Sequence, residues 1–349
     1  MIHDSDLQRN IREVLLRDLK KTARAFQKLK GGRNSRVFRV DCDDGSVVAA
    51  KAYFQSAQDQ RDRMGCEVRA LRFLRSEGRR EVPMPLAVAE AQHIAVYEFV
   101  AGEPLRAGEI GEAEMDQAVA FLQALKTIAD SGRAGDFPAA SEACFSIGAI
   151  LRNLDERFRR LDEASAGQPA LADFLRNKIV PFREVARQHC LDLCRQHNIA
   201  PDVEIPLSER TLSPSDFGFH NALRGADGRL VFLDFEYFGW DDPAKTIADF
   251  FLHPGMQLPP ALKQRFFSGM MKALAGVPKM QHRVRATYAL FGLKWCAILL
   301  NEFTLEHLAR RCFADDRTKE SGHKTAQLEK ARHMLNQVTN DYHDFPGRP

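Results

Sequence analysis

The 349-residue sequence lacks an apolar run long enough to cross a bilayer. A spanning helix needs about 20 consecutive apolar residues, and the most apolar stretch, residues 286–300, is shorter and contains Lys294. Residues 1–30 mix acidic, basic and leucine residues at roughly helical spacing, without the apolar segment of a signal peptide. We therefore expect neither a leader nor a membrane partner.

The sequence also has little excess charge of either sign. Fifty Lys and Arg against 47 Asp and Glu give a net charge of +3, whereas nucleic-acid binding depends on concentrated positive charge. We therefore expect no nucleic-acid partner. The seven cysteines are odd in number and have no paired spacing, which is typical of reduced thiols in a cytoplasmic protein. With 44% hydrophobic and 28% charged residues, the composition is that of a globular enzyme.

The first hundred residues differ in pattern from the rest of the chain. They predict strands at 37–40 and 47–54 across an Asp/Gly turn, a helix at 61–78, an extended connector at 82–85 and a strand at 93–100. Later residues predict helices at 113–129, 147–162, 170–197, 260–274, 281–308 and 324–341, interrupted between 206 and 249 by polar loops and a strand pair. We predict an α+β domain over 1–100 and a larger helical domain over 101–349, with a ligand cleft between them.

Two features of the first part could contact an anionic ligand. Gly31, Gly32 and Ser35 lie in the loop before the first strand, where glycines let backbone N–H groups approach an anion closely. An ordinary turn would explain the same glycines. Lys51 lies in an otherwise apolar strand and would be costly to bury without a partner, which Glu67 on the next helix could supply. The alternative is a solvent-facing lysine on an edge strand.

A second group of polar residues lies in the interruption of the helical part. Asp216 occupies a loop rich in Pro and Gly, Asn221 follows five residues later, and Asp234 ends an apolar strand. Oxygen ligands from Asn and Asp suit Mg²⁺, and a carboxylate can accept a hydroxyl proton.

Together these residues resemble a known family. Lys51, Glu67, Asp216, Asn221 and Asp234 occur in the order of the phosphoryl-transfer set of protein-kinase-like enzymes. The chain is more similar to the aminoglycoside phosphotransferase and choline kinase-like family of small-molecule kinases. The similarity covers about residues 25 to 310, most of the chain. It rests on five stretches: 67–85, 97–105, 216–221, the strand ending at 234, and 239–243.

The resemblance implies a protein-kinase-like fold of class α+β, with a small β-rich N-lobe and a larger, mostly helical C-lobe. In the N-lobe it implies that Lys51 binds the α- and β-phosphates of ATP and pairs with Glu67. The backbone near Glu98 to Val100 would meet the adenine. The glycine loop is sparse, as it commonly is in this family.

For the C-lobe the resemblance implies that Asp216 is the catalytic base and that Asn221 and Asp234 hold Mg²⁺. The reaction would transfer the γ-phosphoryl group of ATP to a hydroxyl of a small-molecule acceptor, either a sugar, an amino sugar or an amino alcohol. The resemblance implies no particular oligomeric state.

The sequence departs from the family pattern beside the catalytic aspartate. The family usually reads His-Gly-Asp-x-His-x-x-Asn, and the two His positions are here Pro214 and Gly218. The departure leaves the orientation of Asp216 open and separates this chain from the aminoglycoside-modifying subset of the family. Thr246 stands where the family often has Asp, and Asp249 is a candidate substitute.

Residues around the metal ligands are candidates for contact with the acceptor. Glu236 and Asp241 could bind a cationic or hydroxylated acceptor, or could be solvated acids. His220 could touch the substrate or make only local hydrogen bonds.

Two rival functions fit parts of the pattern. A pseudokinase that binds nucleotide and regulates a partner is favoured by the missing histidines, but it has no need for all of Asp216, Asn221 and Asp234. A protein kinase would have a fuller glycine loop and a long activation segment after Asp234, whereas the chain returns quickly to helix after Pro243.

Overall fold

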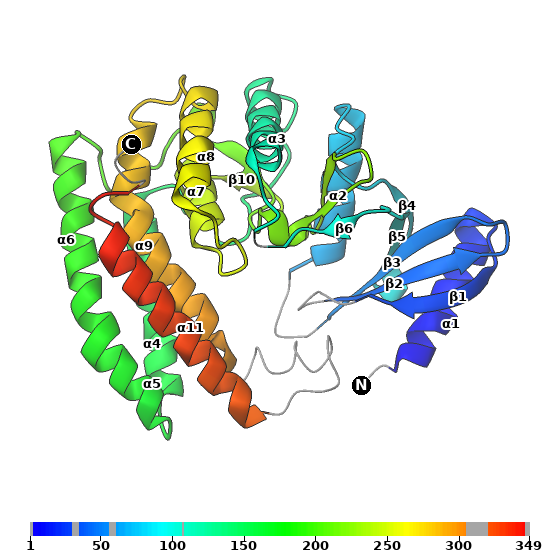
Figure 1. The fold of residues 1–349 in the computed structure, drawn as a ribbon, viewed down its shortest axis with the longest axis horizontal. Coiled ribbons are helices and arrows are strands. Elements are labelled where there is room, and N and C mark those ends of the chain that lie inside the picture. The colour runs from blue at the N-terminus through cyan, green and yellow to red at the C-terminus, as the bar shows by residue number, and fades with distance from the viewer. Residues whose placement is uncertain (1–2, 30–34, 56–60, 107, 305–319, 346–349) are drawn as a thin grey trace. The chain divides into compact units, whose positions relative to one another are not determined.

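The computed structural model describes residues 3–29, 35–55, 61–106, 108–304 and 320–345 (Figure 1). They form two compact units. The first contains the described residues up to Pro104 together with Asn221–Tyr237, and the second contains the other described residues. Within these ranges, no helix is both long and apolar enough to span a bilayer.

The first unit is built on a five-stranded antiparallel sheet with the strand order β1-β2-β3-β5-β4 (Figure 1). Its elements are α1 (Asp4–Val14), β1 (Ala23–Lys28), β2 (Ser35–Cys42), β3 (Val47–Tyr53), α2 (Arg63–Ser76), β4 (Pro85–Ala89), β5 (Ile94–Glu98) and β6 (Glu103–Pro104). Two later strands, β8 (Ala222–Arg224) and β9 (Leu230–Phe232), pair with β6 in the order β6-β8-β9. This second sheet joins residues 221–237 to the first unit.

Packing of α1 against the sheet forms one core of the first unit. Leu7, Ile11 and Val14 lie one helical turn apart and are buried together with Val48 and Ala50 of β3. Because side chains of a strand alternate between faces, Lys51 lies on the face of β3 opposite this core. β3 lies between β2 and β5 and is not an edge strand, which contradicts the solvent-facing alternative for Lys51.

The second unit is mostly helical (Figure 1). Its main elements are α3 (Glu112–Asp130), α4 (Ile147–Ala164), α5 (Pro169–Phe174), α6 (Val180–Gln196), β7 (Thr211–Ser213), β10 (Gly239–Asp241), α7 (Pro243–Leu252), α8 (Pro260–Ala273), α9 (Met280–Leu300) and α11 (Glu320–Asp341). Helix α9 is buried on most of its surface and contacts α4, α6, α7 and α11. An antiparallel pair, β7 with β10, lies on either side of the Asp216 loop in the sequence.

Two predicted helices differ from the structure in their bounds. The segment predicted as one helix over 170–197 is α5 and α6 separated by a wider turn at Leu175–Ile179. Pro181 follows that turn and has no N–H for a helical hydrogen bond. The helix predicted over 281–308 ends at Leu300 and is followed by a 3₁₀ turn at Asn301–Phe303, after which the N–H and hydroxyl of Thr304 both bond the Asn301 carbonyl. Residues 305–308 lie outside the described ranges.

Short strands near both ends of the five-stranded sheet were missed. Residues 1–30 have helical spacing in the sequence, but only α1 and the turn after it are helical. Lys20 adopts a left-handed conformation (φ 56°) that ends the helix before β1. β1 and β4 are the edge strands of the sheet. Edge strands carry weak sequence signals because one side of each strand has no partner.

Candidate active site

The first cluster of site residues surrounds Lys51. The Lys51 Nζ donates to Glu67 Oε2 at 2.6 Å and to Asp234 Oδ1 at 2.9 Å. Lys51 is only 8% exposed and Glu67 4%. The pairing of Lys51 with Glu67 that the resemblance implies is thus present, and Asp234, 183 residues away along the chain, contacts the same ammonium group.

Glu67 is fixed by further hydrogen bonds. The Tyr53 hydroxyl donates to Glu67 Oε2 at 2.6 Å, and the Phe235 N–H donates to Oε1 at 3.3 Å. The hydroxyls of Tyr53 and Tyr97 lie 2.6 Å apart, and burial raises the pKa of both phenols well above the usual value. Both rings therefore stay neutral donors beside the carboxylate.

A second ion pair adjoins this cluster. Glu236 lies with its Oε1 3.6 Å from Arg63 Nε and its Oε2 3.8 Å from Lys51 Nζ. Burial by itself lowers the pKa of Lys51, but Asp234, Glu67 and Glu236 raise it, and the net result lies well above the usual value. Lys51 is therefore a permanent cation. Arg63 was not found from the sequence, because no spacing links the start of α2 to Glu236.

A backbone hydrogen bond links Asn221 to the residue before Asp234. The Leu233 N–H donates to the Asn221 carbonyl at 2.8 Å. Asp234 lies two residues beyond β9 and has a φ of 67°. A left-handed conformation is unfavourable for a residue other than Gly, so the surrounding contacts, including the Lys51 pair, hold Asp234 in place.

The remaining N-lobe candidates lie along the strands. Ser35 begins β2, is buried and pairs with Tyr53 across the sheet. Glu98 ends β5, where its carboxylate accepts the Met84 N–H at 3.2 Å. Val100 is half-buried just beyond that strand. Gly31 and Gly32 lie outside the described residues.

The second cluster surrounds Asp216 in the second unit. The loop after β7 places Ser215 in a left-handed conformation (φ 68°), and Asp216 follows it with 35% of its side chain exposed. His220 Nε2 lies 3.1 Å from Asp216 Oδ1, and His253 Nε2 lies 3.8 Å from the same oxygen. His220 therefore makes a local hydrogen bond, and its contact with a substrate stays a prediction.

A buried ion network around Lys245 contacts the Asp216 loop. The Lys245 Nζ donates to Ser215 Oγ at 3.1 Å and pairs with Asp241 at 2.6 Å and with Asp249 at 3.3 Å. Burial lowers the pKa of Lys245, but Asp241 and Asp249 raise it above the usual value. The Thr246 hydroxyl lies 3.3 Å from Ser213 Oγ at the start of the loop.

The solvated alternative for Glu236 and Asp241 is wrong. Glu236 is 4% exposed and Asp241 is fully buried. Each is already paired with a cation, Glu236 with Arg63 and Asp241 with Lys245. The carboxylates therefore stabilise the interiors of their own units. Among the described residues, the acids that do face solvent lie elsewhere, for example in the turn at Asp43.

A buried cap fixes the helix that carries Lys245. The carboxylate of Asp242 accepts the Ala244 N–H at 2.9 Å as the N-cap of α7, and Pro243 takes the first helical position, as the sequence predicts. The other oxygen accepts from Arg283 Nε at 2.7 Å. Burial lowers the pKa of Arg283, but Asp242 raises it above the usual value.

Replacing Arg283 with Met is expected to lower the free energy of unfolding by about 3–5 kcal/mol, because the Asp242 carboxylate stays buried without its cation. Urea unfolding followed by circular dichroism measures the change. Arg187→Met on the exposed face of α6 is the matched control, and its effect should stay within about 0.5 kcal/mol. Equal effects of the two substitutions would contradict the prediction.

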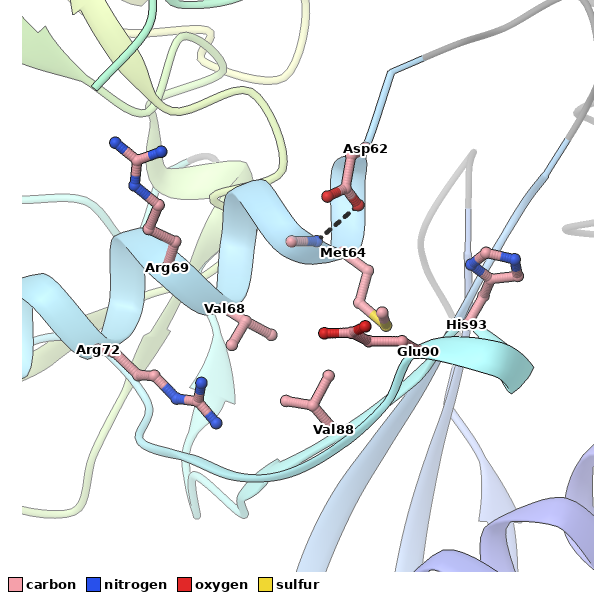
Figure 2. A pocket seen from close by; sticks show the side chains of 9 residues that line it. Asp62, Met64, Val68, Arg69, Arg72, Val88, Glu90 and His93 are labelled. Atoms are coloured by element: carbon pink, nitrogen blue, oxygen red, sulfur yellow. Dashed lines mark hydrogen bonds between the residues drawn. The ribbon is translucent and has the colours of Figure 1, made fainter. Parts of the chain in front are cut away.

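A pocket of the first unit contains none of the predicted site residues. It lies beside α2 and β4 and is lined by Asp62, Met64, Gly65, Val68, Arg69, Arg72, Val88, Glu90 and His93 (Figure 2). In Figure 2 the Asp62 carboxylate bonds back to its own helix as the N-cap of α2. The pocket therefore adds no catalytic group to the Lys51 cluster.

The antiparallel sheet of the first unit, its buried Lys–Glu pair and the helical second unit define a protein-kinase-like fold. Solved structures of this fold resemble the chain over almost its full length. A spectinomycin phosphotransferase in complex with ADP and spectinomycin has a TM-score of 0.61 at 14% identity, covering 96% of this chain and 98% of its own. A choline kinase from Cryptosporidium parvum has a TM-score of 0.56 at 14% identity, covering 95% and 97%.

A choline/ethanolamine kinase family protein from Mesorhizobium loti has a TM-score of 0.57 at 17% identity and covers 92% of each chain. At these identities the likeness shows the fold. No curated protein matches the sequence. The chain belongs to the phosphotransferase enzyme family, whose model matches residues 25–269. It is therefore a phosphotransferase that acts on a hydroxyl acceptor.

Proposed function

We propose that this enzyme transfers the γ-phosphoryl group of ATP to a hydroxyl of a sugar, an amino sugar or an amino alcohol. The observation that carries the proposal is the buried Lys51 cation held between Glu67 and Asp234. Placing this cation in the interior requires several acidic partners, and a binding site for a polyanion is a reason to keep it there. The complexes of related folds with ADP and with an ATP analogue support a nucleotide ligand.

In this proposal Lys51 binds the α- and β-phosphates, and Glu67 sets the direction of its ammonium group. Tyr53 and the Phe235 N–H hold Glu67 against rotation. The backbone near Glu98 to Val100 accepts the adenine. This arrangement would fix the nucleotide before transfer, and positioning is the main requirement of phosphoryl transfer.

The residues near Asp234 fit a magnesium ion. Asn221 and Asp234 offer amide and carboxylate oxygens, which Mg²⁺ prefers. Carboxylate oxygens of Glu67, Asp234 and Glu236 lie within 4.8 Å of one another, so the site is rich in hard donors. When bound, the ion would neutralise negative charge on the phosphates. Asn221 and Asp234 would hold the ion, while the carboxylates of Glu67 and Glu236 stay paired with the Lys51 ammonium group.

Asp216 is the base in this proposal. A carboxylate that accepts the acceptor hydroxyl proton must be held in a fixed direction, and contacts with His220 and His253 hold one of its oxygens. We also propose a cytoplasmic location, on the ground that the cysteines have no paired spacing.

Incubation with Mg²⁺ and γ-labelled ATP across sugars, amino sugars, amino alcohols and protein substrates tests the proposal. We expect label on at least one small acceptor, separated by chromatography. Label on protein would favour a protein kinase. Tight nucleotide binding without transfer to any acceptor or to water would favour a pseudokinase, and either result would contradict the proposed function.

A further inference from the structure

We propose that His220 and His253 are positioning residues that orient the Asp216 carboxylate for its role as base. The inference rests on the proposed function. The two histidines that the family has beside this aspartate are Pro214 and Gly218 in this chain. The structure brings two other histidines to the same carboxylate, one from the turn after the loop and one from the end of α7.

The two imidazoles act on one oxygen. His220 Nε2 lies 3.1 Å and His253 Nε2 3.8 Å from Asp216 Oδ1. Their rings are stacked, with centroids 3.6 Å apart and planes 11° from parallel. The hydrogen bond from His220 and the adjacent His253 ring restrict rotation of the carboxylate, and thereby set the direction in which Oδ2 points. General-base catalysis depends on that direction.

The hydrogen-bond partners of the rings decide where their protons are. His253 Nδ1 accepts the Gly255 N–H at 3.1 Å, so the proton of its neutral ring lies on Nε2, toward Asp216. His220 Nε2 is within hydrogen-bonding distance of a carboxylate, which only accepts. Both rings therefore present N–H groups to the base.

A metal ion is the other occupant that these three side chains suggest. Ligand atoms of Asp216, His220 and His253 lie within 4.8 Å of one another. A ring nitrogen must be deprotonated to bind a metal, and the Gly255 bond places the His253 proton on the nitrogen that would have to bind. The geometry therefore favours a hydrogen bond from His220 to Asp216, with the His253 Nε2 3.8 Å from the same oxygen.

Gly218 leaves the space that the His220 ring occupies. A Cβ at position 218 would lie 2.7 Å from His220 Nδ1 and 2.8 Å from Met256 Sδ. A side chain at 218 and the present position of His220 therefore exclude one another.

The His253 ring contacts the buried ion network of Lys245 through Trp295. The Trp295 ring meets His253 edge to face, with centroids 4.8 Å apart. The Trp295 Nε1–H donates to Asp249 Oδ1 at 2.8 Å, and Asp249 pairs with Lys245. These contacts extend from the interior of the unit to the base. Asp249 therefore helps to hold Trp295 and Lys245 beside the Asp216 loop.

The test compares alanine with a side chain that keeps the donor. His220→Ala should lower kcat by about 10- to 100-fold for transfer to the best acceptor in the panel, or to water. The KM for ATP should change by less than about twofold. His220→Gln, whose Nε2 can replace the ring donor, should recover most of the loss. His253→Ala should lower kcat by a smaller factor, because its contact is longer.

A second stacked pair in the same unit supplies the matched control. His197 and His282 have centroids 3.6 Å apart and planes 16° from parallel. His282→Ala removes an equivalent ring stack and should leave kcat unchanged. Gly218→Ala should reproduce the loss of His220→Ala, and the double variant should be no worse than either single one, because both act on the same ring.

The outcomes separate this inference from the proposed function. Absence of transfer by the wild type overturns the proposed function. A wild type that is active, with His220→Ala and His220→Gln equally impaired or both unimpaired, overturns the inference alone. Nitrogen-15 chemical shifts of the two imidazoles give a reading independent of turnover. We expect the Nε2–H tautomer in both, and an Nδ1–H tautomer in His253 would overturn the positioning role.

Discussion

Replacing Asp216 with Asn is expected to lower kcat by about 10²- to 10⁴-fold while ATP still binds, because an amide cannot accept the hydroxyl proton. The substitution keeps the shape of the side chain. Its amide oxygen can still accept from His220, which lies 3.1 Å from Oδ1. The fold should therefore be retained. Steady-state transfer to the best acceptor and calorimetric titration with ATP measure the two effects separately.

Asp43→Asn is the matched control for this loss. It removes the same charge from the exposed turn between β2 and β3, where Asn is as well tolerated as Asp. Its kcat should equal that of the wild type. If Asp216→Asn kept more than about a third of the wild-type kcat, general-base catalysis by Asp216 would be excluded, because that role requires at least a hundredfold loss.

The second large effect is expected at Lys51. Lys51→Met removes the cation from Glu67 and Asp234 together. Transfer should fall by about 10²- to 10³-fold, because a charge aimed at the phosphates is lost. The free energy of unfolding should fall by about 3–5 kcal/mol, because Glu67 remains buried without its main partner. Transfer rates and urea unfolding give the two numbers.

A double variant separates the two effects. In Lys51→Met/Glu67→Gln the buried carboxylate is neutral as well, so stability should recover in part while transfer stays lost. Lys126→Met removes another buried lysine, which bonds the Ser208 carbonyl at 3.1 Å, and should keep the wild-type rate. Recovery of transfer together with stability would show that Lys51 acts only through the fold.

The fold was predicted best where the signal was local. The hairpin turn at 43–46, the end of α2 beside Gly78 and the start of α7 at Pro243 all agree with the structure. Each depends on the preferences of a few neighbouring residues, such as the positive φ of 79° that Gly78 adopts. β6 was missed because its partner β8 lies more than a hundred residues later in the chain.

Contacts between residues that are far apart in the chain were not predicted from the sequence. Arg63 and Tyr53 belong to the Lys51 cluster, and His253 lies beside Asp216. No spacing in the sequence predicts these contacts. His253 lies at the end of α7, and only the packing of that helix within the second unit brings its ring over His220. Chain positions alone do not encode such proximity.

The amino-acid sequence by itself determined the family and the order of the candidate site residues, because Glu67, Asp216 and Asp234 each lie in a stretch that resembles the family. The tertiary structure alone decided which charges are buried and what neutralises them. A carboxylate such as that of Asp241 can be removed from water only where a cation is brought to it. That condition is set by distances in space.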